Sequence, residues 1–254
     1  MASNDNSADL FPLVSPQKHL VPRKEYGEPY TGVDCTIFDA SALKPTARDY
    51  GRMPDVASWR PADVILFCSY GNVTAITEIV RRVQRQRGFD RFHSRWTHAA
   101  LYIGGGKFIH VTRDDEDLEN RVGVKDVSSF VKQAHYRVRS PRTLSDDARA
   151  DIVDFAISLV NNKTYSTMKA VASALESFRL LDERFVTSRE LFDGIVCSDV
   201  VSQSYDHVIP GFPVFATATH QAALPATLSE SGFLADIDIA WCRIPASARS
   251  AASG

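Results

Sequence analysis

The chain has 254 residues, which suits one domain of ordinary size or one domain with an added arm. Hydrophobic residues make up 44% and charged residues 24% of the chain, so a sizeable core can form without metal ions or disulfide bonds. The net charge of −2 argues against nucleic acid as a partner. The sequence contains no apolar run long enough to cross a bilayer, although peripheral contact with a membrane stays open.

Residues 1–6 lack both the positive start and the apolar stretch of a secretory signal peptide. We therefore expect the protein to be cytoplasmic at synthesis, with export by a specialised secretion system left open. The four cysteines are far apart and form no CxxC pair, which is a poor framework for zinc or for disulfides. By default each is expected to be a buried, reduced thiol. The four are Cys35, Cys68, Cys197 and Cys242.

The first part of the chain, residues 1–58, is rich in Pro, Gly, Asp and Ser and predicts an arm or loops, with one short strand near 35–38. A compact apolar run predicts a buried strand over 62–68. Apolar residues at helical spacing predict a helix over 73–86. Its arginines predict a solvated face, and an anionic substrate or a membrane headgroup is a less favoured alternative. These are Arg81, Arg82, Arg85 and Arg87.

A β-hairpin is the clearest structural prediction. Strands are expected over 97–103 and 107–112, and three glycines between them suit a tight turn because Gly tolerates positive φ. A phosphate-binding loop is excluded because no Lys-Ser/Thr follows the glycines and no helix opens there. Further strands are predicted at 122–124 and 136–138, with a short helix at 127–131 between them.

The second half of the chain is mainly helical. Ser145 is a good N-cap for a helix that ends at residues 161–162. Another helix starts at 195–201, just after Gly194. Because the strands fall together with helices before and after them, we expect an α+β fold with a mainly antiparallel sheet. The remaining predictions are an insertion at 166–192 with a helix over 168–181, loops around Pro210, Pro213 and Pro225, a strand at 237–244 and a flexible tail at 246–254.

Cys197 is the candidate nucleophile. At the start of a helix its thiolate would be favoured by the helix dipole and by free backbone N–H groups. Those N–H groups can also stabilise an oxyanion. The alternative is a small buried residue on an apolar helix, and position alone favours that alternative.

His98 and His110 lie on the two strands of the predicted hairpin. Counting from the turn places them near each other, possible partners on one face of the sheet. His98 could take a proton from a thiol, and His110 could accept the other ring N–H of His98 and fix its tautomer. Each could instead be a hydrogen-bonded strand residue, and a zinc site formed by Cys197, His98 and His110 is a further rival.

These segments, in this order, resemble the circularly permuted NlpC-like papain superfamily, which includes bacterial cell-wall amidases and the lecithin–retinol acyltransferase group. The resemblance implies a papain-like domain over 59–245 with the histidine strand before the cysteine helix. It implies Cys197 as nucleophile, His98 as base and His110 as the orienting residue, a position that is often acidic in such proteins. The matching segments are PADVILF (61–67), THAALYIG (97–104), KFIHV (107–111), the helix from Ser145 leading into KTY (163–165), VCSDVV (196–201) and LPATLS (224–229).

The resemblance implies acyl transfer without a cofactor. An amide substrate, such as a peptidoglycan fragment, makes the protein an amidase or peptidase. A lipid acyl ester makes it a phospholipase or acyltransferase, with the apolar insertion near Phe178 and Phe185 as a candidate lid. A non-catalytic binding module of the same fold and a delivered antibacterial toxin stay open. The sequence does not indicate an oligomeric state.

Overall fold

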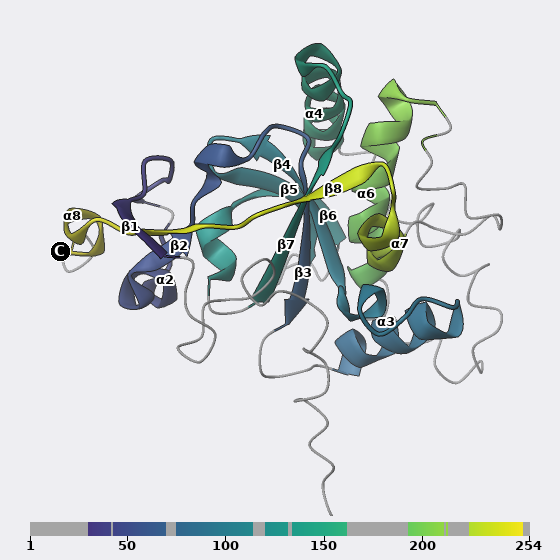
Figure 1. Cartoon of the computed structure of the whole chain (residues 1–254), viewed down its shortest axis with the longest axis horizontal. Coiled ribbons are helices and arrows are strands. Elements are labelled where there is room, and N and C mark those ends of the chain that lie inside the picture. Colours follow the sequence, from purple (N-terminus) through teal and green to yellow (C-terminus); the bar gives the residue numbers. More distant parts are fainter. Residues whose placement is uncertain are drawn as a thin grey trace, which may run out of the picture.

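The computed structural model describes residues 30–41, 43–69, 75–113, 120–131, 134–161, 193–210, 212 and 224–250. In this part of the chain the fold is α+β, as predicted, with one six-stranded sheet, one three-stranded sheet and packed helices (Figure 1). The predicted insertion at 166–192 lies outside the described residues. None of the described helices is long and apolar enough to cross a membrane.

The large sheet is antiparallel throughout, in the order β6-β5-β4-β3-β7-β8. The predicted hairpin is confirmed, and Gly104, Gly105 and Gly106 at its turn all have positive φ. Near-continuous apolar runs explain why the central strands β3 and β4 are buried on both faces. The strands are β3 (Val64–Ser69), β4 (His98–Gly104), β5 (Lys107–Arg113), β6 (Asn120–Asp126), β7 (Ala134–Pro141) and β8 (Leu234–Ile237).

Helices cover one face of the large sheet. Helix α6 packs on β4 and β5, and α4 packs on α6 (Figure 1). Ser145 caps α4 as predicted, because its Oγ accepts from the N–H of Ala148 at 3.2 Å. The core on this face joins Leu66, Ala99, Leu101 and Ile109 of the strands to Ile152, Ala156, Cys197 and Val200 of the helices. The helices are α3 (Ala75–Gln86), α4 (Asp146–Asn161), α6 (Asp193–Val208) and α7 (Pro225–Glu230), with the short η4 (His93–Arg95) beside α3 and α7.

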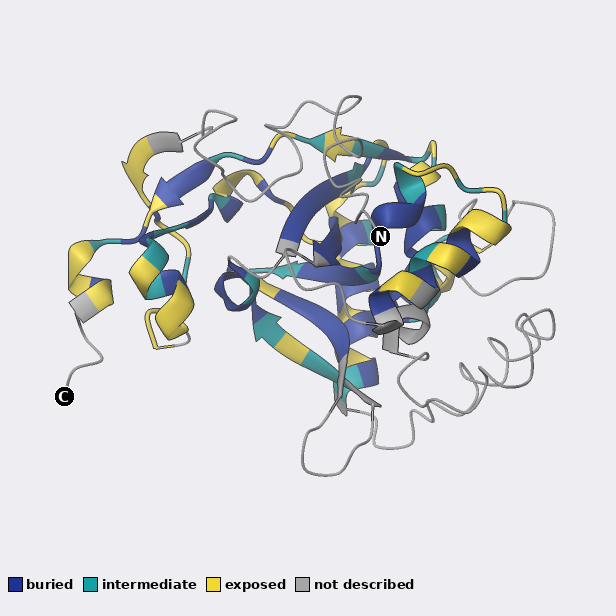
Figure 2. Cartoon of the chain, turned by 90° about the horizontal axis from the view of Figure 1, so that it is seen from below, coloured by how far each residue is buried: buried dark blue, intermediate teal, exposed yellow. Residues whose placement is uncertain are grey.

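The small sheet lies on the opposite face and combines the two ends of the described chain. Its order is β1-β9-β2, with β1 parallel and β2 antiparallel to β9. A second core cluster joins this sheet to the large one, and in Figure 2 the central strands between the two clusters are largely buried. The members include Met53, Trp241 and Cys242 from the small sheet, with Phe67, Phe108 and Tyr136 from the large one. The elements are β1 (Tyr30–Asp34), β2 (Arg52–Pro54), β9 (Trp241–Arg243) and η5 (Val127–Phe130).

Several local predictions near the chain ends were wrong. The segment before residue 58 contains α2 (Pro45–Tyr50) and η3 (Val56–Ser58), and its strand β1 ends just before the predicted 35–38. Pro225 begins a helix, because a proline suits the first turn, where an N–H has no partner. The predicted strand 237–244 is the end of β8 plus β9, and the predicted flexible tail contains helix α8 (Ala246–Ser250). The strands here pair with partners far away in sequence, which a local pattern does not indicate.

Cys35 and Cys242 form a disulfide, so the expectation of four reduced thiols was wrong for this pair. Their Cα atoms are 5.1 Å apart, although the two residues are separated by 207 positions in sequence. The pairing of β1 with β9 brings them together. Cys68 and Cys197 are buried and form no disulfide, as expected.

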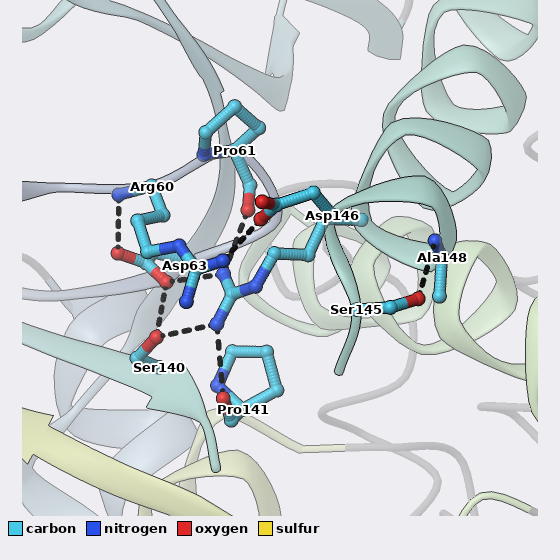
Figure 3. Close-up of polar contacts among 9 residues, drawn as sticks. Arg60, Pro61, Asp63, Ser140, Pro141, Ser145, Asp146 and Ala148 are labelled. Atoms are coloured by element: carbon cyan, nitrogen blue, oxygen red, sulfur yellow. Dashed lines mark hydrogen bonds and ion pairs between the residues drawn. The ribbon is translucent and has the colours of Figure 1, made fainter. Parts of the chain in front are cut away.

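A buried ion pair fastens α4 to the start of β3 and the end of β7 (Figure 3). Arg149 donates to Asp63 Oδ1 at 3.0 Å, and Ser140 donates to the same oxygen at 2.6 Å. The other carboxylate oxygen accepts from the backbone N–H of Arg60 at 2.8 Å. Burial raises the pKa of Asp63, and these donors counteract part of that rise. The cluster thus holds a charged carboxylate in the core by supplying nearly all of its hydrogen bonds.

Candidate active site

His98 and His110 meet across the β4–β5 hairpin, as predicted. The register pairs Leu101 with Ile109, so the two histidines are diagonal neighbours on one face of the sheet. His98 Nε2 lies 2.9 Å from His110 Nδ1, which is a hydrogen bond between the two rings. The centroids of the rings are 5.1 Å apart and nearly perpendicular, at 88°. The hairpin therefore fixes the orientation of the His98 ring.

Aromatic rings surround this pair. Phe67 lies opposite His98 in the β3–β4 register, with the ring centroids 5.7 Å apart. Phe130, from η5, stacks on His98 at 6.5 Å and meets His110 edge-on at 5.8 Å. Phe108 contacts His110 at 5.2 Å. The histidine pair is therefore placed in a largely apolar setting on the face that also carries the small sheet.

The Cys197 thiol approaches the same strand from the helix face. Its Sγ atom accepts a hydrogen bond from the backbone N–H of Ala99 at 3.3 Å, and the side chain is fully buried. In β4, the residues paired with β5 are Leu101, Tyr102 and Gly104. The N–H of Ala99 lies before this paired stretch and bonds to the sulfur instead. Ala99 belongs to the helix-side core, while the ring of His98 lies among aromatic residues of the other face. The thiol thus lies against the residue that follows His98.

Cys197 is not at the helix start. Helix α6 begins at Asp193, so Cys197 is its fifth residue and lies beyond the first four N–H groups that lack helical partners. Gly194, which was expected to precede the helix, lies in its first turn. The predicted oxyanion site at Cys197 N–H is therefore not supported. The donor that the structure offers beside the sulfur is the N–H of Ala99, which the sequence did not indicate because the contact depends on tertiary packing.

Both histidines are neutral at pH 7. Burial lowers the pKa of His98 to about 4, with a further contribution from the charge of Lys125. Burial also lowers the pKa of His110 to about 2, and the neighbouring His98 and Lys125 add to the effect. Lys125 lies opposite Phe108 in the β5–β6 register, on the same face as the two histidines. Lys125 could not be recognised from the sequence, because only the pairing of β5 with β6 brings it close to the histidines.

The hydrogen bond between the rings permits two tautomers. His110 Nε2 is buried and has no hydrogen-bond partner within the described residues. If His98 Nε2–H donates to His110 Nδ1, the Nδ1 atom of His98 keeps a lone pair that can accept a proton. In the other tautomer this lone pair is replaced by an N–H. Only the first arrangement makes His98 a base.

The other candidate groups have structural roles. Arg81 donates to the Cys68 sulfur at 3.1 Å, so this arginine is not part of the predicted solvated face. His93 Nδ1 lies 2.8 Å from Ser229 Oγ, and the ring of His207 stacks on Phe155 at 4.2 Å. No three His, Cys, Asp or Glu side chains in the described ranges are placed to hold a metal ion together, so the zinc alternative has no geometric support there.

Comparison of the chain with family models, with curated proteins and with solved structures gave no match.

Proposed function

We propose that the protein is a cysteine hydrolase with a circularly permuted NlpC-like papain fold, acting on an amide bond. Cys197 is the nucleophile, His98 the base and His110 the residue that orients His98. The observation that carries the proposal is the 2.9 Å contact between His98 and His110, one residue along β4 from the contact of Ala99 with the thiol. The packing of a cysteine-bearing helix on an antiparallel sheet supports the same assignment.

The reaction has two halves. The ring of His98 and the Cys197 sulfur lie on opposite faces of β4, so the mechanism requires the start of β4 to rearrange until the ring reaches the sulfur. His98 Nδ1 then accepts the Cys197 S–H proton while the sulfur attacks the carbonyl carbon, and the carbonyl oxygen takes the negative charge. His98 then returns the proton to the amine as the C–N bond breaks, which leaves a thioester. In the second half, water gives a proton to His98 and attacks the thioester, and the thiol leaves with that proton. Each half returns His98 to the neutral state.

The surroundings of the histidines set the resting state of the site. Because burial and Lys125 disfavour imidazolium, His98 rests as a neutral imidazole. Charge on the sulfur is stabilised by the N–H of Ala99, since hydrogen bonds to a charged acceptor are stronger than those to a neutral one. Since Cys197 is fully buried, attack on a substrate also requires movement of the residues that cover the sulfur.

A lipid acyl ester is the second candidate substrate, and one observation favours it. Arg82, Arg85 and Arg91 are exposed on and just after α3. Residues 78–95 hold six arginines and two acidic residues, while the whole chain has a net charge of −2. This local excess of positive charge suits a surface of anionic lipids. Hydrolysis of an acyl ester against hydrolysis of a peptide amide, measured side by side, distinguishes the two substrates.

The test of the proposed function is the rate of alkylation by iodoacetamide. In a Cys68→Ser background, Cys197 is the only remaining cysteine outside the disulfide, because the other two form it. A general base typically contributes about a hundredfold or more to a reaction rate. We therefore expect His98→Ala to slow alkylation of Cys197 at pH 7 by at least about tenfold. His207→Ala, which removes a ring stacked on Phe155, is the matched control and leaves the rate unchanged.

If His98→Ala and His207→Ala react at the same rate as the parent protein, the thiol has no base and the proposal fails. A non-catalytic binding module then becomes the better interpretation. The same result follows if Cys197 reacts only under conditions that unfold the protein, which circular dichroism at each condition detects.

A further inference from the structure

The Cys35–Cys242 disulfide fastens an edge strand. In the order β1-β9-β2, strand β1 has one neighbour, β9. The backbone pairing, an exposed ion pair between Asp34 and Arg243, and the disulfide just after β1 join the two strands. The outward-facing part of β1 is open to solvent, and Val33 is 62% exposed. The sulfur-bearing residues themselves are buried, with 6% exposure for Cys35 and 3% for Cys242. We therefore expect an external thiol to reach the disulfide when β1 opens locally at the edge of the sheet.

The contacts lead from this disulfide to the candidate active site. Cys242 lies opposite Met53 of β2 in the antiparallel register. Strand β2 packs against η5, whose Phe130 stacks on His98 and meets His110. A second line of contacts joins Trp241 to Tyr136 at 6.2 Å and Tyr136 to Phe67 at 5.4 Å. Phe67 in turn contacts His98. The small sheet thus supports the aromatic cover of the histidine pair.

We propose that the Cys35–Cys242 disulfide is a redox latch for the candidate active site. When it is oxidised, the small sheet holds η5 and Phe130 over His98 and His110. When it is reduced, β1 and β9 separate more easily, the cover loosens and the site loses activity. This proposal rests on the proposed function, and it makes the protein active in an oxidising compartment and silent in a reducing one.

The chemistry of the latch is thiol–disulfide exchange. A glutathione thiolate attacks one sulfur of the disulfide and forms a mixed disulfide, which releases the other cysteine as a thiol after proton uptake. A second glutathione attacks the mixed disulfide and releases the first cysteine. The two cysteines are reduced by two electrons, and two glutathiones are oxidised to one glutathione disulfide. The reverse reaction closes the latch.

The test compares the Cys68→Ser protein with a Cys68→Ser, Cys35→Ser, Cys242→Ser variant in glutathione buffers of increasing reducing strength. Acid quenching and mass spectrometry give the fraction of molecules in which the disulfide is intact. NMR of the histidine rings follows the titration of His98, and calorimetry gives the melting temperature. On reduction we expect the titration of His98 to move from about 4 toward 6.5 by at least about one pH unit. The melting temperature should fall by roughly 5–15 °C.

The triple variant is the matched control, and it should resemble the reduced protein at every buffer composition. The latch is overturned if the protein with a reduced disulfide keeps the His98 titration and the melting temperature of the oxidised form. It is also overturned if the disulfide fails to form in oxidising buffer. Neither readout needs turnover, so failure of the proposed function appears separately, as alkylation of Cys197 that does not depend on His98.

Discussion

The backbone N–H of Ala99 donates a hydrogen bond to the Sγ atom of Cys197 over 3.3 Å. Through this contact, helix α6 is joined to β4 at the position next to His98. A backbone donor in a strand normally bonds to the neighbouring strand. The N–H of Ala99, the second residue of β4, bonds instead to a side chain from the helix layer. The sulfur therefore takes the place of a carbonyl acceptor for this backbone N–H of the sheet.

Substitution of Cys197 tests this role of the sulfur. Cys197→Ser keeps an acceptor for the Ala99 N–H, whereas Cys197→Ala leaves a buried N–H without a partner. We expect both variants to lose activity and the alanine variant to be less stable than the serine variant by about 1 kcal/mol. Urea unfolding of the two proteins measures the difference. An alanine variant as stable as the serine variant would show that the hydrogen bond contributes nothing.

The low pKa of His110 predicts a loss of stability in acid. Its pKa is about 2 in the folded protein and about 6.5 in an unfolded chain. Below pH 6.5 the unfolded chain therefore binds more protons at this site, and the free energy of unfolding falls as pH falls. The slope from this one residue is at most about 1.4 kcal/mol per pH unit. It is present between pH 6.5 and about 2.

His110→Asn is the matched control for this slope, because it removes the titrating group. Urea unfolding between pH 7 and pH 4.5 should show a shallower loss of stability in the variant than in the parent protein. Other titrating groups contribute equally to both proteins and cancel in the comparison. Identical slopes would mean that His110 titrates normally in the folded state.

A carboxylate in place of His110 should change the base. In His110→Asp an ionised side chain close to His98 Nε2 stabilises the imidazolium, so the pKa of His98 should rise from about 4 by at least about one unit. His110→Asn accepts the same hydrogen bond without a charge and should leave that pKa low. NMR titration of His98 in both variants gives the answer. The rate of Cys197 alkylation falls at low pH, where the base is protonated. In His110→Asp the pH of this fall should rise by the same amount as the pKa of His98. If that pH does not change, His98 is not the base.

The Asp63–Arg149 pair should be far more important for stability than an exposed pair. Arg149 is 3% exposed and Asp63 is fully buried, so Arg149→Met leaves a buried charge without its partner (Figure 3). We expect a loss of about 3–5 kcal/mol, part of which Asp63→Asn should restore in the double variant. The control is Arg60→Ala, which breaks the exposed pair with Asp146 and should cost less than about 1 kcal/mol. Equal losses would mean that burial does not set the strength of these pairs.

The central hairpin and the histidine pair could be predicted because the information is local. Two short apolar runs define the strands, and the glycine turn between them fixes the register closely enough to place His98 near His110. The helix that begins after Ser145 follows from its cap and its apolar stripe in the same way. In each case the residues that determine the structure are close to each other in sequence.

The parts that could not be predicted depend on partners far apart in the chain. The small sheet requires β1 to meet β9, and its disulfide joins residues 207 positions apart. The contact between Ala99 and Cys197 requires α6 to pack on β4. Lys125 reaches the histidines only through the β5–β6 register. The start of α6 was misplaced for a different reason, because a glycine in the first turn costs a helix little when packing supplies its stability.

The pairing of β1 with β9 also sets an order of events during synthesis. Strands β3 to β7 are consecutive in the chain and can pair while later residues are still being made. Strand β1 leaves the ribosome early but has to wait for β9, almost at the end of the described chain. Closing so long a loop comes late in folding. A newly made chain therefore passes through a stage in which β3 to β7 are paired, while β8 and the small sheet have not yet been added.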